Sequence, residues 1–378
     1  MPSAGEEIKA AIIKVAEEHF GEVLSCEVVG TTTSKVVLAK GVAMKVRWSG
    51  INPAEMWQRQ QLANVPRTLA VLKGEGRPFV FIEWWQGESF PNDFDEVCKL
   101  PPDYFRMYGN FIKQVNWRGL HEADHSWRNL LYCPDRRMVI NCDVHRLVHV
   151  DVGYKRKLMY SLPEEHQAAF WQGYRTTRED VLDLGKTMGL SMEGPHYQPV
   201  DVADVHIPGK RSPYRFEVMQ WDSFAGMSVL DIGCSHGQCC FEAARRGAKY
   251  VLGIDPLGEA PYKLIVWNNA LAAYAGYDLD FQAFGMGDPL FLSHVKGRRW
   301  DAIFCFAVTG HVPDTAAMMR YIDGATDLLY HEGRLDQPKR DIEDFLRRTT
   351  TFSNVEYLGN ASARDLTGAT RHVYRCTR

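Results

Sequence analysis

The residues whose types and spacing are best suited to chemistry lie in a short loop that contains acidic and glycine residues. An apolar strand is predicted over Ser228–Ile232; it contains Asp231 and enters a turn with Gly233, Ser235 and Gly237. Glycine has no Cβ, so the backbone can turn sharply there and approach a ligand closely. A helix is predicted directly after the loop. This order of strand, glycine turn and helix predicts a ligand-binding edge in a parallel sheet.

A second strand, Tyr250–Ile254, ends at Asp255, where a carboxylate can accept hydrogen bonds from both hydroxyls of a ribose. The same layout could bind a dinucleotide. However, the loop reads D-x-G-x-x-x-G instead of G-x-G-x-x-G, and it has no third glycine placed for a pyrophosphate. Both details argue against a dinucleotide.

From about Tyr214 to Arg378 the chain resembles the class I S-adenosylmethionine-dependent methyltransferases. The resemblance implies that Asp231, Gly233, Ser235 and Gly237 form the methionine side of the cofactor site and that Asp255 holds the ribose. It also implies adenine contacts at Gly287 and Asp288. The run Trp300–Ala307 is similar to the family's fourth strand, so Phe306 is expected beside the cofactor, with the active-site edge just beyond it.

His311 follows that strand, as a histidine does in a subset of these enzymes, and the resemblance makes it a candidate catalytic residue. A solvated loop histidine is the other interpretation. Glu332, in Tyr330–Gly333, is a weaker candidate. Methyl transfer is an in-line displacement in which the protein mainly orients the acceptor. A general base is needed for a hydroxyl or a protonated amine, but not for an ionised acceptor such as a phosphate.

The N-terminal half contains a second set of candidate residues. Asp124 and Asn129 have the D-x-x-x-x-N spacing of a phosphotransferase catalytic loop, with the acid near the reacting hydroxyl and the amide on a magnesium ion. A hairpin follows and ends at Asp143, which is the candidate for the second metal ligand. Asp151 is an alternative because its surroundings look more like D-F-G. The spacing from Asn129 favours Asp143.

Upstream, Val42–Val46 has the pattern of a strand that directs Lys45 toward nucleotide phosphates, and Gly30 begins a turn that could cover them. Together these motifs resemble a small kinase-like domain of the aminoglycoside-phosphotransferase or lipopolysaccharide-kinase type, which implies ATP and Mg²⁺. The departures are a single glycine in the turn, Glu122 where a histidine is usual, and no clear helix acid to pair with Lys45.

Composition is that of an ordinary globular protein: 378 residues, 45% hydrophobic and 24% charged, with a net charge of −3. That charge argues against nucleic acid as a partner. The nine scattered cysteines include no C-x-x-C pair, which suggests reduced thiols and a cytoplasmic location. No apolar run of about 18 residues indicates a transmembrane segment, although peripheral membrane association stays open. The tryptophans are expected in cores, and Arg211 on a solvated face.

These observations predict two domains, one α+β and one α/β. Residues 1–189 are expected to form a compact kinase-like domain, 190–213 a proline-containing linker or ordered crossing segment, and 214–378 a Rossmann-like doubly wound methyltransferase domain. The combination resembles bifunctional kinase–methyltransferase terminators of bacterial O-antigen, in which the phosphate added to a terminal sugar is methylated. Here the order of the domains looks reversed.

That resemblance implies a bifunctional enzyme acting on a small-molecule or glycan acceptor. A methyltransferase with an inactive kinase-like module that binds a nucleotide or a substrate is the main alternative, and a non-enzymatic scaffold is a third. The sequence does not identify the acceptor or the oligomeric state.

Overall fold

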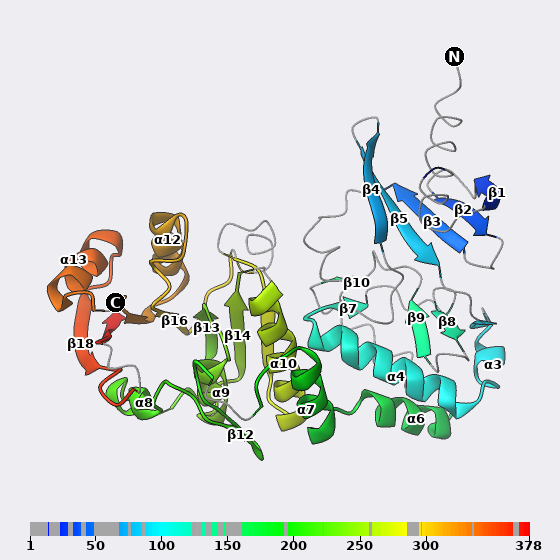
Figure 1. Ribbon diagram of the computed structural model, residues 1–378. Coiled ribbons are helices and arrows are strands. Elements are labelled where there is room, and N and C mark those ends of the chain that lie inside the picture. The colour runs from blue at the N-terminus through cyan, green and yellow to red at the C-terminus, as the bar shows by residue number, and fades with distance from the viewer. Residues whose placement is uncertain are drawn as a thin grey trace. The chain divides into compact units, whose positions relative to one another are not determined.

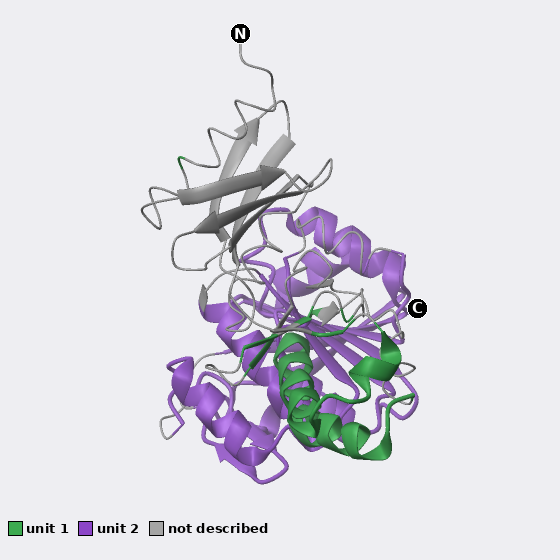
Figure 2. Cartoon of the chain, turned by 90° about the vertical axis from the view of Figure 1, so that its right-hand side faces the viewer, with its two compact units in different colours: residues 1–116, 120–175 green, residues 117–119, 176–378 purple. Residues whose placement is uncertain are grey.

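The computed structural model describes most of the C-terminal half and parts of the N-terminal half. The residues described are 14, 23–28, 33–38, 43–48, 68–74, 77–84, 88–91, 93–122, 127, 130–133, 138–141, 147–148, 161–192, 196–221, 223–256, 259–285, 295, 297–334, 336–365 and 370–378. For some of these strands only the backbone is described. The chain divides into two compact units, residues 1–116 with 120–175 and residues 117–119 with 176–378 (Figure 2).

Unit 1 contains an antiparallel sheet of five strands in the order β1-β2-β3-β5-β4 (Figure 1). These strands are β1 (Val23–Val28), β2 (Thr33–Leu38), β3 (Ala43–Trp48), β4 (Thr68–Gly74) and β5 (Arg77–Trp84). The strand predicted over Val42–Val46 is thereby confirmed as part of β3.

The rest of unit 1 combines helices with short strands. The elements are β6 (Glu88–Ser89), α3 (Phe94–Val97), α4 (Pro102–Trp117), β7 (His121–Glu122), β8 (Leu130–Cys133), β9 (Met138–Asn141), β10 (Leu147–Val148) and α6 (Glu164–Tyr174). The hairpin predicted after Asn129 is confirmed as the antiparallel pair β8–β9.

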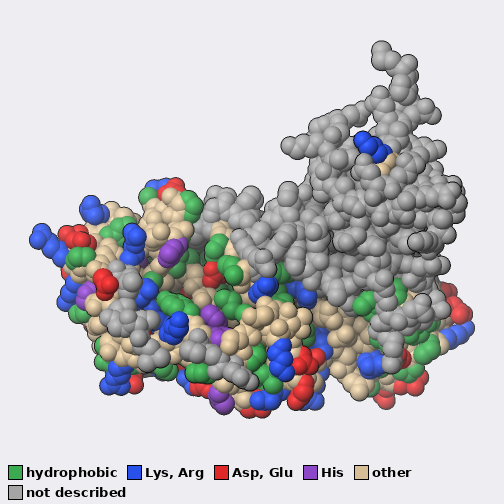
Figure 3. Space-filling model, viewed as in Figure 1, with side chains coloured by type: hydrophobic (Ala, Val, Ile, Leu, Met, Phe, Trp, Pro, Cys, Tyr) green, Lys and Arg blue, Asp and Glu red, His purple; other side chains and the backbone are tan. Residues whose placement is uncertain are grey.

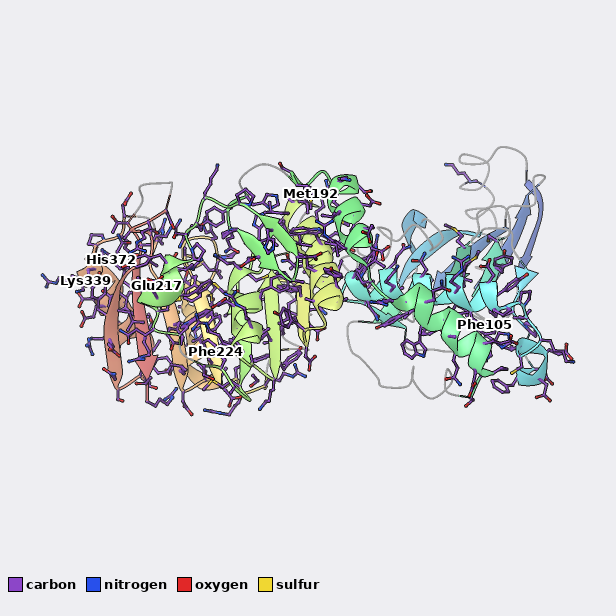
Figure 4. All side chains as sticks on the ribbon, turned by 90° about the horizontal axis from the view of Figure 1, so that it is seen from below. Phe105, Met192, Glu217, Phe224, Lys339 and His372 are labelled. Atoms are coloured by element: carbon purple, nitrogen blue, oxygen red, sulfur yellow. The ribbon has the colours of Figure 1, made fainter. Side chains whose placement is uncertain are left out.

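Helices α4 and α6 meet at two glycines. A Cβ on Gly109 would lie 2.1 Å from the carbonyl oxygen of Phe170, and one on Gly173 would lie 1.8 Å from that of Arg106. Only glycine lets the two backbones approach so closely. Phe105 and Phe111 are fully buried in the core on α4 (Phe105 is labelled in Figure 4).

Unit 2 contains a seven-stranded sheet in the order β15-β14-β13-β16-β17-β19-β18. Its strands are β13 (Ser228–Ile232), β14 (Tyr250–Asp255), β15 (Leu279–Ala283), β16 (Ala302–Phe306), β17 (Leu328–Glu332), β18 (Asn354–Asn360) and β19 (His372–Thr377). Neighbours from β15 to β17 pair in parallel, whereas β19 pairs antiparallel with both β17 and β18. The predicted α/β, Rossmann-like class is confirmed for this unit.

Helices cover both faces of this sheet. They are α7 (Arg178–Thr187), α8 (Tyr214–Val218), α9 (Gln238–Arg245), α10 (Glu259–Ala275), α12 (Thr315–Ala325) and α13 (Lys339–Thr349). Leu230 and Ile232 of β13 pack in one core cluster with residues of α12 and α13. Because side chains alternate along a strand, Asp231 lies on the opposite face, where Cys240 of α9 contacts it.

The order of the strands reverses beside β13. From β13 the chain proceeds through β14 to β15, then crosses to β16 on the other side of β13. Ligands of open α/β sheets bind at such a switch point, beyond the carboxyl ends of the strands. The segment predicted as a linker contains two short paired strands, β11 (Val200–Val202) and β12 (Val205–Ile207).

Acidic and basic side chains lie interspersed on the visible face of unit 2, in keeping with the small net charge (Figure 3). Within the described part of the chain, no helix combines the length and the apolar character needed to cross a membrane.

Candidate active site

The predicted glycine loop lies at the carboxyl end of β13. Gly233, Ser235 and Gly237 all have positive φ angles, of 79°, 52° and 73°. Two amides of the loop, those of Gly233 and Cys234, donate to the carbonyl oxygen of Ile254 at 2.8 and 3.1 Å. A serine in the left-handed region is strained, and such strain persists where the surroundings hold it and is common at functional sites. We call residues 231–237 the cofactor loop.

The space around the loop explains why it contains glycines. A Cβ on Gly237 would lie 2.8 Å from Cζ of Phe281, and one on Gly233 would lie 2.4 Å from Cγ2 of Val308. Both positions also have φ values that favour glycine. Gly237 precedes α9 and provides no side-chain cap. The loop thus presents bare backbone at this edge of the sheet.

Asp255 holds the cofactor loop in place. Its Oδ2 accepts a hydrogen bond of 2.6 Å from the amide of Ser235, and the carbonyl oxygen of Ser235 accepts one of 2.8 Å from Nδ2 of Asn268. Burial raises the pKa of the Asp255 carboxyl. A carboxylate has about four lone-pair positions, so Asp255 retains the capacity to accept from ribose hydroxyls as well.

Asp231 is a buried acid beside the loop. Only 3% of the residue is exposed, and Sγ of Cys240 donates to its Oδ2 at 3.2 Å. Burial raises the pKa of Asp231 to about 7, while the Cys240 hydrogen bond and the charge of Arg215 oppose that rise. A positively charged group bound here would favour the ionised form.

The predicted linker packs on the cofactor loop. The rings of His196 and His236 lie 4.8 Å apart, and Oε1 of Gln198 accepts a hydrogen bond of 3.3 Å from the amide of Gln238. Burial lowers the pKa of His236 to about 4, so this histidine is neutral at physiological pH. The sequence had no periodic signal that could reveal these contacts.

The next strand positions the other predicted residues of this unit. Phe306 ends β16 and is partly buried, and the backbone of Phe306 pairs with that of Glu332 at the end of β17. Ala307 has a φ of 60°, and its amide donates to the carbonyl oxygen of Glu332 at 2.9 Å. His311 is exposed in the following turn.

Several predicted site residues cannot be placed. Gly30, Asp124, Asn129, Asp143, Asp151 and Asp288 lie outside the described residues. Lys45 lies in β3, where its backbone pairs with Lys35 of β2 and Ile82 of β5. In the part of the chain that the structure describes, no group of three or more His, Cys, Asp or Glu side chains could hold a metal ion.

The prediction for Arg211 was wrong: only 3% of it is exposed. It belongs to a buried group, which we call the arginine cluster, formed by Arg211, Arg215, Glu332, Asp365 and Arg371. The guanidinium of Arg215 lies 5.1 Å from the centre of the Phe306 ring. Of these residues, the sequence indicated a chemical role only for Glu332. The others gave no signal, because they are far from Glu332 in the sequence.

Comparisons with known proteins support a methyltransferase domain in unit 2. Residues 215–325 match a family model described as a methyltransferase domain. The ubiquinone biosynthesis O-methyltransferase of Neisseria meningitidis serogroup C (strain 053442) is 34% identical over 95 residues, which are 25% of this chain and 37% of that protein. The tRNA U34 carboxymethyltransferase of Helicobacter hepaticus (strain ATCC 51449 / 3B1) is 27% identical over 122 residues, 30% of this chain and 36% of that protein.

The matched segments span less than two-fifths of these relatives. Among solved structures, the N-terminal domain of EvdMO1 with S-adenosylhomocysteine and D-fucose has a TM-score of 0.39 at 13% identity, covering 54% of this chain and 97% of that one. WbdD in complex with the kinase inhibitor LY294002 has a TM-score of 0.34 at 16% identity, covering 45% and 42%. The family match and these relatives support an S-adenosylmethionine-dependent methyltransferase domain within unit 2.

Proposed function

We propose that unit 2 transfers a methyl group from S-adenosylmethionine to an oxygen of an acceptor, and that unit 1 is an ATP- and Mg²⁺-dependent kinase. The observation that supports the first part best is the cofactor loop, whose Ser235 amide is fixed by Asp255 of β14 at 2.6 Å and whose two glycines pack without a Cβ against Val308 and Phe281. The choice of oxygen follows the relatives named as ubiquinone biosynthesis O-methyltransferases.

The cofactor loop and Asp255 beside it have defined tasks in this proposal. Asp255 accepts hydrogen bonds from the ribose hydroxyls, and the backbone at Gly233 and Gly237 contacts the methionine part. Asp231 pairs with the methionine ammonium group, which favours its ionised form. The bound cofactor supplies an electrophilic methyl group on a sulfonium. The chain orients the acceptor at the edge formed by Phe306 and Ala307 and excludes water.

The kinase activity of unit 1 is proposed from the sequence motifs and the antiparallel sheet. Lys45 lies in the central strand of that sheet, and the hairpin β8–β9 directly follows the position of Asn129. Asp124 would accept the proton of the hydroxyl being phosphorylated, and Asn129 with Asp143 or Asp151 would hold Mg²⁺. The acceptor class that fits both reactions is a hydroxyl-bearing glycan or small molecule, such as a terminal sugar of a surface polysaccharide.

A second candidate function keeps the methyltransferase and assigns unit 1 to binding of a nucleotide or a substrate without transfer. The single glycine in the turn at Gly30 and the glutamate at Glu122 favour it. Under this alternative, ATP binds without turnover or does not bind. The Asp124→Asn variant separates the two, because the kinase proposal requires loss of phosphate transfer with unchanged binding of S-adenosylmethionine.

The test is calorimetric titration of the full chain with S-adenosylmethionine and then with ATP and Mg²⁺. Asp255→Ala should weaken S-adenosylmethionine binding about 100-fold, because hydrogen bonds to a charged group contribute about 1.5–3 kcal/mol each. Lys45→Ala should weaken the binding of ATP and leave the binding of S-adenosylmethionine unchanged. Asp327→Ala, which removes an exposed acid paired with Arg299, is the control. Unchanged binding of S-adenosylmethionine in Asp255→Ala would contradict the cofactor assignment.

A further inference from the structure

The arginine cluster is built around one buried carboxylate. Nη2 of Arg211 donates to both oxygens of Glu332, at 3.1 and 2.9 Å, and Nη2 of Arg215 lies 3.3 Å from Oε2. Nη1 of Arg371 lies 3.6 Å from Oε1. The Glu332 side chain is 1% exposed, and those of Arg211 and Arg215 are each 2% exposed. Three guanidinium groups therefore converge on one acid out of contact with water.

A second acid does not balance the charge. Nε of Arg211 lies 2.9 Å from Oδ2 of Asp365, whose Oδ1 accepts a hydrogen bond of 2.7 Å from the amide of Ser212. Among the described residues of the cluster, three cations thus face two anions. Nε of Arg215 is buried and has no hydrogen-bond partner there. An unbalanced buried charge is costly unless something pairs with it.

Asp231 also lies within electrostatic reach of Arg215. It accepts a hydrogen bond from Cys240, however, and the proposed function assigns it to the ammonium group of the cofactor. With that cation bound, Asp231 is neutralised locally, and the surplus positive charge of the arginine cluster is left for another anion.

The cluster lies at the end of the sheet where an acceptor must sit. Glu332 is the last residue of β17 and pairs in register with Phe306, the last residue of β16. Arg215, on α8 (Glu217 of this helix is labelled in Figure 4), covers the Phe306 ring at 5.1 Å. Arg371 has the most exposed side chain of the three arginines, at 14%. Its guanidinium is therefore the one best placed to meet a group that arrives from solvent.

We propose that the arginine cluster is the subsite that binds an oxyanion of the methyl acceptor, a phosphate or a carboxylate. The inference rests on the proposed methyl transfer. Guanidinium groups match such anions because their planar fork donates two parallel hydrogen bonds. One oxygen of the anion forms a bond to the methyl carbon while the carbon–sulfur bond breaks. The electron pair of that bond stays on sulfur, giving neutral S-adenosylhomocysteine, and no proton moves.

The methionine carboxylate of the cofactor is the other source of an oxyanion. The cofactor loop follows β13, and β17 is two strands away in the sheet order. Neighbouring strands are about 4.8 Å apart, so the end of β17 lies about 10 Å from that of β13. Arg371, which contacts Glu332, directly precedes β19. That strand pairs with β17 on the side facing away from β13. This position favours an anion of the acceptor over the methionine carboxylate.

The test is a calorimetric titration of inorganic phosphate into the full chain saturated with S-adenosylhomocysteine. Arg371→Gln should weaken phosphate binding at least tenfold and change S-adenosylhomocysteine affinity less than twofold. Arg371→Lys keeps the charge but not the planar fork of the guanidinium. Its phosphate affinity should therefore lie between those of the wild type and Arg371→Gln. Arg340→Gln, whose side chain is 90% exposed on α13, is the control and should leave both unchanged.

The outcomes separate this inference from the proposed function. If wild-type protein fails to bind S-adenosylhomocysteine, the methyltransferase proposal fails. If it binds but phosphate does not, or phosphate binds equally to Arg371→Gln, the subsite is wrong. A parallel titration with 5′-methylthioadenosine, which lacks the methionine carboxylate, tests whether Arg371 binds that carboxylate instead. Loss of S-adenosylhomocysteine affinity alone in Arg371→Gln would assign the arginine to the methionine carboxylate and overturn the inference.

Discussion

Two regions at the carboxyl edge of the unit 2 sheet are formed by different kinds of chemical group. On the side of β13 and β14, the cofactor loop consists of backbone in left-handed conformations with two glycines, and Asp255 of β14 accepts a hydrogen bond from one of its amides. On the side of β17, the arginine cluster consists of charged side chains removed from water. The first half is defined by shape, and the second by charge.

This difference determines which changes each half tolerates. A site made of backbone is sensitive to the size of a side chain and insensitive to distant charges. A buried ionic site withstands small changes of shape but not the loss of one partner, because the remaining charge is left without compensation. The cluster is an inefficient way to stabilise a core, since apolar residues often do as well. The proposed anion subsite gives the cluster a role other than stabilising the core.

The largest expected effect is on the charged half. Glu332→Gln should lower the free energy of unfolding by about 3–5 kcal/mol, since three guanidinium groups would then share one acid. Urea unfolding of the full chain measures this. The control is Glu356→Gln, which breaks a half-exposed pair with Arg375 and should cost less than about 1 kcal/mol. Equal effects of the two substitutions would show that burial of the cluster is energetically unimportant.

The shape-defined half should respond to a single methyl group. Gly237→Ala places a Cβ 2.8 Å from Phe281 at a φ of 73° and should cost about 2–4 kcal/mol of stability, with S-adenosylmethionine affinity reduced more than tenfold. Gly226 has nearly the same φ, 71°, but no atom within 4 Å of its Cβ. Gly226→Ala should therefore cost only the backbone strain of about 1–2 kcal/mol and leave binding intact. The reverse order would contradict the steric argument.

The same contrast explains how far the sequence could predict this molecule. Gly233 and Asp255 are only 22 positions apart in the sequence, and Gly237 lies between them. Their predicted roles follow from local spacing on strand, loop and helix. The alternation of strands and helices likewise predicted the class of the unit 2 fold. Such signals need no knowledge of which distant segments meet.

The arginine cluster gave no such signal. Arg211 and Arg215 meet Glu332 across 121 and 117 positions of sequence, and each alone resembles a surface cation. Their burial depends on how the segment before β13 crosses the end of β17, which is a property of the tertiary fold. In unit 1, local patterns predicted the strand that contains Lys45, whereas the metal and catalytic assignments there stay predictions.

A smaller effect concerns the charge state of Asp231. Its pKa, raised by burial to about 7, means that the folded protein holds a proton that the unfolded chain releases near pH 4. This contribution to stability is complete below pH 4 and is lost as the pH rises through 7. Asp231→Asn should therefore match the wild type near pH 4 and exceed it at pH 8 by at least about 1.4 kcal/mol, the equivalent of one pKa unit.

Thermal unfolding at the two pH values, without ligand, measures this gain. The exposed Asp278→Asn variant is the control and should show no pH-dependent gain. The same Asp231→Asn protein should bind S-adenosylmethionine at least tenfold more weakly at pH 8, because the ammonium group loses its partner. A variant that is more stable and still binds normally would remove Asp231 from the cofactor half.

The smallest expected effect separates the two interpretations of His311. An exposed histidine that acts as a general base on a hydroxyl should contribute about 10²–10⁴-fold to the rate. If the arginine cluster instead holds an already ionised oxygen, no base is needed, and His311→Ala should reduce methyl transfer less than about tenfold and leave cofactor binding unchanged. Transfer of labelled methyl groups to a panel of sugar phosphates and uronic acids, with the neutral sugars as controls, measures this. A loss of 100-fold or more with a neutral sugar as the acceptor would favour the histidine and a hydroxyl over the charged subsite.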